Sequence, residues 1–237
     1  MDKVLWMVML GWVVLLGGCF PMAEPERLPV YDSVEDASAA EGYLELDLSG
    51  QQLTRIPDGL DGIAGLQRLR LRGNDLGTIG DELGMLAHVP WLDMGRAGVE
   101  SLPDAVGAFE ALHSWWLNDN ALTSLPEAVL SVESLRYLNL DRNEIEALPE
   151  DLGNMQSLRW LRLNGNNLTE LPNSITELGE LERLYLAQNE ISVLPDDIGD
   201  MRSLDTLVLT GNPLEDGELE RIREALPACD VVFREIP

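Results

Sequence analysis

Residues suited to catalysis are scarce in this sequence. The chain has two histidines, His88 and His113, and two cysteines, Cys19 and Cys229. Their spacing matches neither a Ser-His-Asp or Cys-His constellation nor a zinc site, and the acidic run at 141–144 lacks the spacing of a calcium loop. Carboxylates are plentiful, but an acid–base pair also needs a desolvated cleft, for which the sequence gives no sign. We therefore expect no enzymatic activity, no metal site and no cofactor.

Aromatic and arginine side chains are the residues best suited to binding, and they recur 23 positions apart. Aromatic rings and guanidinium groups dominate the energetics of interfaces because they combine large contact areas with directional hydrogen bonds. A common spacing brings such residues together only if the backbone repeats with the same period. The residues that we predict to contact a partner are Trp91, Trp116, Tyr137, Asn139, Trp160, Arg162, Arg183 and Tyr185.

The backbone does repeat with this period. Eight units begin at Tyr43 and at every twenty-third residue after it, without insertion or deletion. Positions in a unit are counted as offsets from its first residue, and offsets 0, 3, 5, 10, 13, 17 and 20 are expected to be apolar. Of these 56 positions, 53 are apolar, and the exceptions, Gly217, Arg221 and Glu224, all fall in the last unit.

Each unit has the pattern of a short strand, a turn and a short helical segment. Apolar residues at offsets 3 and 5 alternate with polar ones, as in a strand with one buried face. A Leu-Pro pair then interrupts regular structure, and apolar residues at offsets 17 and 20 suit a short helix or 3-10 turn. One unit cannot bury its own apolar edge, so the units must stack into a right-handed solenoid with a parallel sheet along one side.

The repeat resembles a known family. The motif L-x-x-L-x-L-x-x-N-x-L, followed by L-P-x-x-I-G-x-L, is similar to the 23-residue class of leucine-rich repeats and is clearest at 158–180. The resemblance covers 43–214 and implies an α/β horseshoe with the sheet on its concave side and short helical or 3-10 segments on its convex side. It says little about the partner, because this fold hosts many functions.

The resemblance also implies a structural role for the asparagine at offset 8. In this family such side chains point inward and hydrogen-bond to neighbouring backbone, so they satisfy groups that would otherwise be buried unpaired. Gln51 and Ala97 stand at this offset in the first and third units. The other six units carry Asn74, Asn120, Asn143, Asn166, Asn189 and Asn212.

Residues at offsets 2, 4 and 6 are predicted to face the concave side, because offsets 3 and 5 are buried. Over these positions and offset 7, the units hold seven arginines and five acidic residues, whereas the whole chain has a net charge of −26. Arg68 and Arg70 have acidic neighbours in adjacent units and are expected chiefly to neutralise them. No carboxylate stands at the same offsets beside Trp160 and Arg162, which favours a binding role there. Trp115, at offset 3, is predicted to be core.

The first 18 residues predict a secretory signal. Lys3 is followed by a 15-residue apolar run with three glycines, which is too short for a comfortable membrane-spanning helix. The sequence at 16–19, Leu-Gly-Gly-Cys, resembles the lipobox of bacterial lipoproteins; an uncleaved anchor is the less favoured alternative. The resemblance implies a lipidated Cys19 at the mature N-terminus, export, and attachment to the cell envelope through lipid alone, at the outer membrane or cell surface.

The remaining segments predict a tether and two caps. Residues 19–30 are expected to form a flexible tether after the lipidated cysteine. Residues 31–42 favour a short N-terminal capping helix, with Asp32 or Ser33 as its N-cap. Residues 215–237 are expected to form the C-terminal cap, which would contain Cys229 as a small buried residue.

These features predict an envelope-anchored protein, most simply a monomer, that binds a protein or peptide on its concave face. Two alternatives stay open. Stacked aromatics and asparagines would also suit a glycan-binding surface module, and a structural spacer would bind nothing tightly. A nucleic-acid partner is not expected, because a strongly acidic chain repels phosphate backbones.

Overall fold

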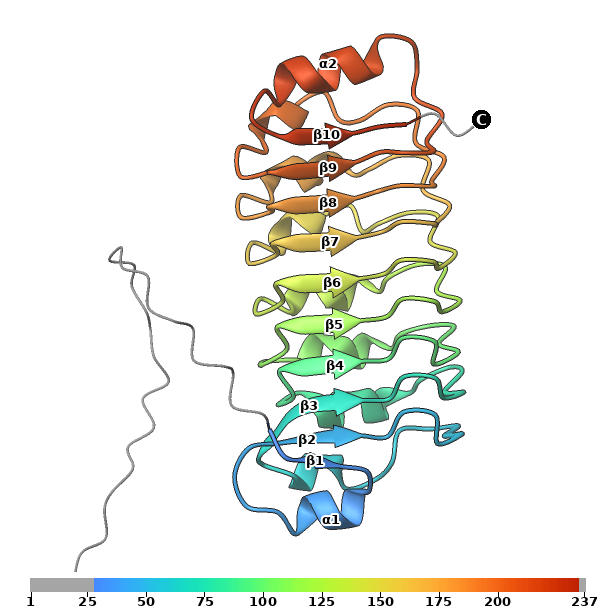
Figure 1. Ribbon diagram of the computed structural model, residues 1–237, viewed down its shortest axis with the longest axis vertical. Coiled ribbons are helices and arrows are strands. Elements are labelled where there is room, and N and C mark those ends of the chain that lie inside the picture. The colour runs from blue at the N-terminus through green and yellow to red at the C-terminus, as the bar shows by residue number, and fades with distance from the viewer. Residues whose placement is uncertain (1–27, 235–237) are drawn as a thin grey trace, which may run out of the picture.

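The structure is a computed structural model that describes residues 28–234. Within this range, ten parallel strands form one sheet in chain order, stacked one above the next (Figure 1). The signal predicted at 1–18, Cys19 and most of the predicted tether lie outside the described residues. The strands are β1 (Val30–Tyr31), β2 (Leu44–Asp47), β3 (Leu66–Arg70), β4 (Trp91–Asp93), β5 (Ser114–Trp116), β6 (Tyr137–Asn139), β7 (Trp160–Arg162), β8 (Arg183–Tyr185), β9 (Thr206–Val208) and β10 (Asp230–Val232).

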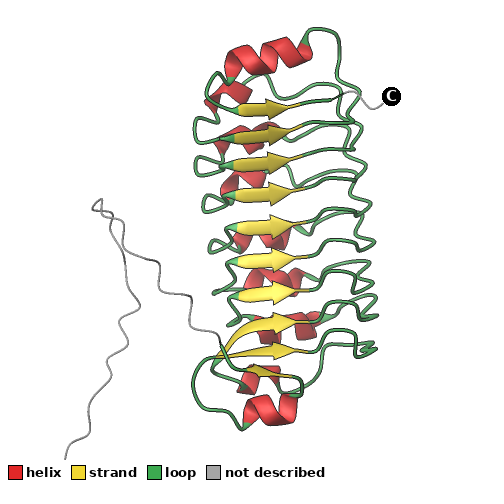
Figure 2. Cartoon of the chain, viewed as in Figure 1, coloured by secondary structure: helices red, strands yellow, loops and turns green. Residues whose placement is uncertain are grey.

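Short 3-10 helices line the side of the stack behind the strands (Figure 2). Each follows the Leu-Pro or equivalent position of its unit, where the apolar residues at offsets 17 and 20 point back into the core. In the described range they are η1 (Leu60–Gly62), η2 (Asp81–Leu86), η3 (Asp104–Ala108), η4 (Glu127–Ser131), η5 (Leu152–Asn154), η6 (Asn173–Glu177) and η7 (Ile198–Asp200). The predicted α/β solenoid is thereby confirmed.

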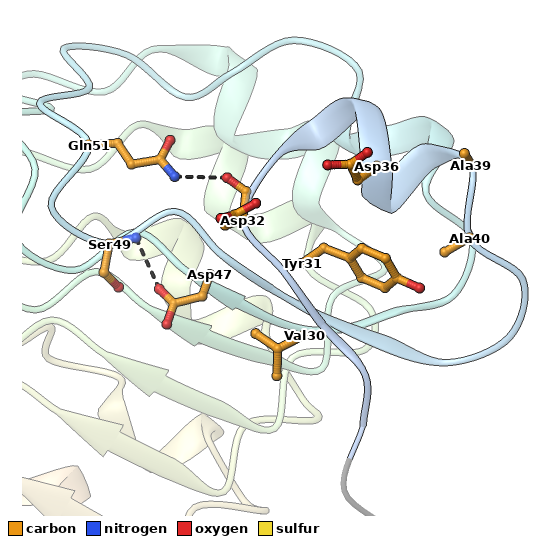
Figure 3. A pocket seen from close by; sticks show the side chains of 9 residues that line it. All are labelled: Val30, Tyr31, Asp32, Asp36, Ala39, Ala40, Asp47, Ser49 and Gln51. Atoms are coloured by element: carbon orange, nitrogen blue, oxygen red, sulfur yellow. Dashed lines mark hydrogen bonds between the residues drawn. The ribbon is translucent and has the colours of Figure 1, made fainter.

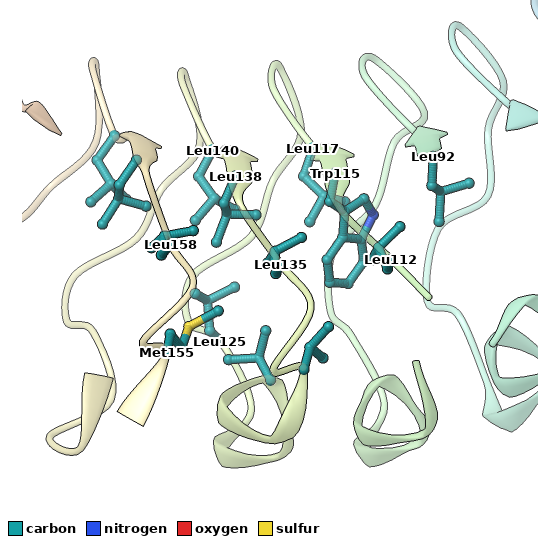
Figure 4. Packing of buried hydrophobic residues seen from close by; sticks show 14 of the residues in the cluster. Leu92, Leu112, Trp115, Leu117, Leu125, Leu135, Leu138, Leu140, Met155 and Leu158 are labelled. Carbon is teal, nitrogen blue, oxygen red and sulfur yellow. The ribbon is translucent and has the colours of Figure 1, made fainter. Parts of the chain in front are cut away.

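The 23-residue period sets both the strand pairing and the core. Trp160 pairs with Arg183, and Leu161 pairs with Leu184, each 23 positions apart. The apolar columns of successive units therefore stand side by side and form one continuous buried cluster between the sheet and the 3-10 helices (Figure 4). Because each unit is too small to bury its own apolar edge, this shared core holds the stack together.

The first unit departs from the predicted register. Tyr43 was expected in the core, but it is 50% exposed, and Leu44 is buried in its place. The pairing between β2 and β3 shifts by one residue there, since Leu44 pairs with Leu66 whereas Glu45 pairs with Arg68. The backbone packs so closely at this shift that a Cβ at Gly65 would lie 1.8 Å from the carbonyl oxygen of residue 42.

The N-terminal end is closed by α1 (Val34–Ser38) and by β1. Ser33 is the N-cap: its hydroxyl oxygen accepts a hydrogen bond from the Asp36 amide at 3.2 Å, a bond typical of helix starts. The Gln51 side chain donates to the Asp32 carbonyl at 2.8 Å and so ties the cap to the first turn of the solenoid. Strand β1 extends the sheet beyond the repeats, which the sequence did not predict.

The C-terminal end is closed by α2 (Glu218–Ala225) and β10, and it explains the three breaks in the apolar pattern. Gly217 has a φ of +85°, a conformation that favours glycine, directly before the helix. Arg221 takes the place of an apolar residue, and its guanidinium donates to the Leu194 carbonyl at 2.8 Å and pairs with the buried Glu218. A backbone carbonyl of the seventh unit is therefore satisfied by the cap.

The asparagines at offset 8 form a ladder inside the turns. Asn143 donates to the carbonyls of Leu117 and Leu140 at 3.0 and 2.9 Å, and its side-chain oxygen accepts the Leu122 amide at 3.1 Å. The same three kinds of bond are made by Asn74, Asn120, Asn143, Asn166, Asn189 and Asn212. At the corresponding position of the third unit, Ala97 is buried, whereas Gln51 of the first unit is exposed.

Two further properties concern only residues 28–234. No helix in this range is both long and apolar enough to span a bilayer. No cluster of three or more histidine, cysteine, aspartate or glutamate side chains in it is arranged to hold a metal ion.

Burial, the main cause, raises the pKa of the half-buried Cys229 thiol to about 11, so this cysteine stays protonated at neutral pH.

Candidate functional site

The candidate site lies on the face of the sheet that points away from the core, formed by offsets 2, 4 and 6 and called the sheet face below. Strand pairing aligns Tyr137, Trp160 and Arg183 in one row across β6, β7 and β8. A second row runs across β5, β6, β7 and β8 through Trp116, Asn139, Arg162 and Tyr185. The structure brings together the residues of the aromatic–arginine cluster: Trp116, Tyr137, Trp160, Arg162, Arg183 and Tyr185.

Rings and guanidinium groups contact one another within this cluster. The rings of Tyr137 and Trp160 meet edge to face, with centroids 5.2 Å apart. The Arg183 guanidinium lies 4.2 Å from the Trp160 ring centroid, and the Arg162 guanidinium lies 4.8 Å from that of Tyr185. Cation–π contacts of this kind hold both partners in fixed positions, so the cluster is ordered before any partner arrives.

Trp91 extends the cluster toward the N-terminal end. Its ring centroid is 6.4 Å from that of Trp116, which is 38% exposed and is one of the few large exposed apolar side chains in the described residues. The guanidinium groups of Arg70 and Arg68 lie 5.5 and 6.0 Å from the Trp91 ring. Trp91 therefore joins the aromatic–arginine cluster to the arginines of β3.

A small hollow opens in the middle of the cluster. It has a volume of about 80 Å³ and is walled by the side chains of Trp116, Tyr137, Trp160 and Arg162. Leu138 and Asn139 contribute to its floor, and most of its surface is ring or aliphatic carbon. The hollow is thus an apolar depression with one cationic side chain, Arg162, at its border, which suits one apolar side chain of a partner.

The sequence missed the carboxylate beside Arg162. The Nε atom of Arg162 donates to Asp141 at 2.7 Å, and Asp141 is only 2% exposed. Asp141 also accepts bonds from the backbone and side-chain nitrogens of Asn164, at 2.8 and 2.9 Å. Asp141 stands two residues after Asn139, the strand partner of Arg162, and just beyond the end of β6, so a comparison of equal offsets alone could not find it. The lack of a carboxylate at the same offset therefore did not mean that Arg162 is unpaired.

Asn139 is largely buried, although it lines the hollow. It was predicted to face a partner, but it is only 8% exposed between the larger side chains of Trp116 and Arg162 on the flanking strands. Its side-chain oxygen accepts the Asp141 amide at 3.0 Å and so shapes the end of β6. A short side chain that points outward is still covered when the side chains on both flanking strands are longer. The repeat period predicts the direction of a side chain but not this loss of exposure.

The remaining sheet-face arginines are neutralised, with one exception. Glu45 lies 2.6 Å from Arg70 and 3.8 Å from Arg68, so these two arginines do neutralise an acidic neighbour as predicted. Arg72 lies 3.8 Å from Asp93. Arg183, by contrast, has no carboxylate within salt-bridge distance among residues 28–234.

Burial also affects the ionisation of Asp93, an acidic residue of β4 on the sheet face. It raises the pKa of Asp93 above its ordinary value, although the Gly95 amide and the Arg72 and Arg70 guanidinium groups act in the opposite direction. The Gly95 amide donates to the Asp93 carboxylate at 2.9 Å. The carboxylate is therefore held by groups of its own turn and is not presented to a partner.

A larger hollow, of about 970 Å³, lies at the N-terminal cap between α1 and the turn after β2 (Figure 3). Three aspartates, Asp32, Asp36 and Asp47, line it, but none of the residues predicted to contact a partner does. Figure 3 shows the Asp47 carboxylate accepting the Ser49 amide, at 3.0 Å. The hollow is thus lined by a single aromatic residue, Tyr31, and by no cationic residue, unlike the cluster.

Comparison with known proteins identifies the repeats. A family model described as a leucine-rich repeat region matches residues 128–224. The chain also superposes on internalin C2 from Listeria monocytogenes with a TM-score of 0.69 and 18% identity, over 85% of this chain and 90% of that one. Residues 128–224 therefore match the leucine-rich-repeat family, and the described residues have the fold of a leucine-rich-repeat solenoid.

A second solved structure similar to this solenoid is the leucine-rich-repeat ectodomain of the plant membrane receptor kinase GASSHO1/SCHENGEN3 from Arabidopsis thaliana, in complex with CASPARIAN STRIP INTEGRITY FACTOR 2. The TM-score is 0.61 and the identity 26%, over 78% of this chain. The solenoid spans only 23% of that ectodomain. No curated protein matches it in sequence.

The turns of the solenoid carry a further charged group beside the cluster. Residues at offset 7 all have positive φ, and half of them are glycines. Arg96, Asp119 and Arg142 occupy three successive turns instead, with φ between 53° and 60°. Arg142 donates to Asp119 at 2.8 Å, and Arg96 lies 3.5 Å from it. This rim triad keeps side chains where glycine would be less strained.

The rim triad should make stability pH-dependent. The hydrogen bond from Arg142, the largest cause, lowers the pKa of Asp119 to about 2. A depressed pKa contributes stability that is present above pH 4 and is lost as the pH falls toward 2. Asp119→Asn, which tolerates positive φ, should therefore flatten the pH dependence of the unfolding free energy between pH 4 and 2. Urea unfolding at several pH values checks this, with the exposed Asp151→Asn as control; an unchanged slope in Asp119→Asn would contradict it.

Proposed function

We propose that this solenoid is an exported, lipid-anchored protein of the cell envelope that binds a protein or peptide through its sheet face. The observation that carries the binding proposal is the aromatic–arginine cluster, a group of partly exposed rings and guanidinium groups that contact one another around an apolar hollow. The rest of the chain is strongly acidic, whereas this face is not. Such a contrast is typical of a recognition surface.

The fold supports a protein partner. Leucine-rich-repeat solenoids typically serve as protein-interaction modules, and the plant ectodomain similar to this chain was solved in complex with another factor. The asparagines that would favour a glycan are also engaged internally. Asn118 and Asn139 are buried, and Asn164 bonds to Asp141 and to the Ala187 amide at 2.9 and 2.8 Å. Few free amide groups are left to recognise sugar hydroxyls, so the protein alternative is favoured.

A cross-linking experiment tests the binding proposal. A photoreactive phenylalanine analogue at Thr206, beside Arg183 on β9, should cross-link a discrete partner in intact cells. The double variant Trp160→Ala/Arg183→Ala should reduce the yield at least about thirtyfold, because each side chain has the character of an interface hot spot worth 1–2 kcal/mol or more. Yields are measured by blotting, and mass spectrometry identifies the cross-linked product.

The double variant Glu150→Ala/Asp151→Ala is the matched control. Both residues are exposed on the side away from the sheet face, so the yield should stay unchanged. Full cross-linking in the Trp160→Ala/Arg183→Ala variant would rule out binding at the cluster. A product whose added mass is removed by glycosidase, and which contains no peptides of a second protein, would establish the glycan alternative, and the absence of any product would favour a spacer.

The anchoring part of the proposal rests on the sequence at 16–19. If it holds, the intact mass of the membrane-extracted protein should correspond to loss of residues 1–18 plus lipid on Cys19. More than one acyl chain is expected, since a single chain gives only marginal membrane binding. Cys19→Ser should block processing, whereas Cys229→Ser should leave the mass pattern unchanged apart from the substitution. A wild-type protein that retains an unmodified Met1 would contradict anchoring.

A further inference from the structure

Among the described residues, Arg183 is the sheet-face arginine that forms no salt bridge. The others at offsets 2, 4 and 6 lie within 4 Å of a buried or half-buried carboxylate: Arg68 and Arg70 of Glu45, Arg72 of Asp93, and Arg162 of Asp141. Within residues 28–234, Arg183 instead lies over the Trp160 ring, at 4.2 Å. A ring face attracts the cation but accepts few of its five N–H donors. The guanidinium is thus positioned but not neutralised.

The indole of Trp160 also borders the apolar hollow. Trp160 both walls the hollow and supports Arg183, so the two features have a fixed separation. The hollow is centred on β6, and Arg183 stands on β8, two strands further along the sheet. Adjacent strands are about 4.8 Å apart, which places the two features about 10 Å from each other. An extended peptide covers this distance with about three residues.

The size of the hollow limits what can enter it. A cavity that accepts benzene has a volume of about 150 Å³, whereas this hollow has about 80 Å³. An aliphatic side chain such as that of valine or leucine therefore fits better than an aromatic ring. Beyond Arg183, β9 presents only the smaller side chains of Thr206 and Val208 on the sheet face. A bound chain can therefore continue past Arg183 instead of ending there.

We propose that the partner segment crosses the strands in an extended conformation, with an acidic side chain bound by Arg183 and an aliphatic side chain about three residues away in the hollow. This inference rests on the proposed function and specifies its chemistry. Charge complementarity carries it, because Arg183 is the partly exposed cation of the cluster that lacks a carboxylate among the described residues. A carboxylate would accept two parallel N–H bonds from the guanidinium, which Trp160 already holds in place.

Selection from displayed peptides tests the inference. A library of random decapeptides, each followed by a fixed polar sequence so that no free C-terminus reaches the site, is selected against the purified intact protein. Enriched peptides should contain Asp or Glu two to four residues from Val, Ile or Leu. An enriched peptide should lose at least tenfold in affinity when its acidic residue is replaced by the corresponding amide.

Matched variants locate the acidic preference. Selection against Arg183→Gln should enrich peptides without an acidic preference, whereas Arg202→Gln, which removes an exposed arginine outside the sheet face, should behave as wild type. Arg183→Gln retains the aliphatic stem and is expected to fold, as circular dichroism and the melting temperature will check.

The outcomes separate this inference from the proposed function. Enriched peptides that require Trp160 but show no acidic preference, or that bind Arg183→Gln as tightly as wild type, would overturn the inference and leave binding at the sheet face standing. If no peptide is enriched, or if enriched peptides bind Trp160→Ala unchanged, both are overturned.

Discussion

Replacing Trp115 with alanine should lower the free energy of unfolding by about 3–5 kcal/mol, the range for deleting a large aromatic side chain from a core. Trp115 is fully buried at offset 3, where most units carry leucine. Its ring packs against Phe109 with centroids 5.5 Å apart, and Figure 4 shows it beside Leu112. Neighbouring units cannot close the resulting cavity, because their spacing is fixed by the ladder of backbone hydrogen bonds.

The adjacent residue provides the control. Trp116 is 38% exposed on the sheet face, so Trp116→Ala should cost about 1 kcal/mol at most. Trp115→Phe should cost less than Trp115→Ala, because it retains most of the ring and removes an indole N–H that has no hydrogen-bond partner in the structure. Urea unfolding followed by circular dichroism measures all three. Similar losses for Trp115→Ala and Trp116→Ala would mean that the register is wrong.

Asn143→Ala should lower the free energy of unfolding by about 3 kcal/mol or more. The substitution leaves two carbonyls and one amide of the turns without partners, and each unpaired buried group costs about 1–3 kcal/mol. Asn139→Ala is the matched control on the same strand and turn. It removes one hydrogen bond, to the Asp141 amide, and should cost about 1 kcal/mol.

Urea denaturation of the two asparagine variants decides between these expectations, provided that unfolding stays cooperative and the slope with denaturant is unchanged. A loss in Asn139→Ala as large as that in Asn143→Ala would show that the asparagine ladder has no special role. Because Asn139 is buried, its replacement should cost more than an ordinary surface substitution, which the sequence alone would not have indicated.

The period made most of the fold predictable. Equal offsets in different units face the same environment, so one motif assigned the inward or outward direction of nearly every strand residue. Trp115 and Trp116 are adjacent and chemically identical, yet the pattern placed the first in the core and the second on the surface. Composition or propensity could not have separated them, because the distinction depends only on position within the unit.

What the sequence did not predict arises where equal offsets are not the nearest neighbours. The Arg162–Asp141 contact runs diagonally between offsets 4 and 6, and long side chains can reach across such a distance. Tyr43 misses the core because the pairing shifts where the first repeat joins the cap. Strands β1 and β10 belong to caps, which have no second copy to reveal a pattern.

The pairing of each strand with only its immediate predecessor and successor in the chain also shapes how this protein can acquire its structure. No side-chain hydrogen bond among the described residues joins positions more than 27 apart, so no step of assembly must wait for a distant segment. As the polypeptide is synthesised, each new unit of 23 residues can add one strand to the sheet already formed, and the loop-closure entropy lost is similar each time. Rapid, progressive folding from the N-terminal cap onward is therefore expected despite an all-parallel sheet, a topology that in other folds requires slow, long-range closure.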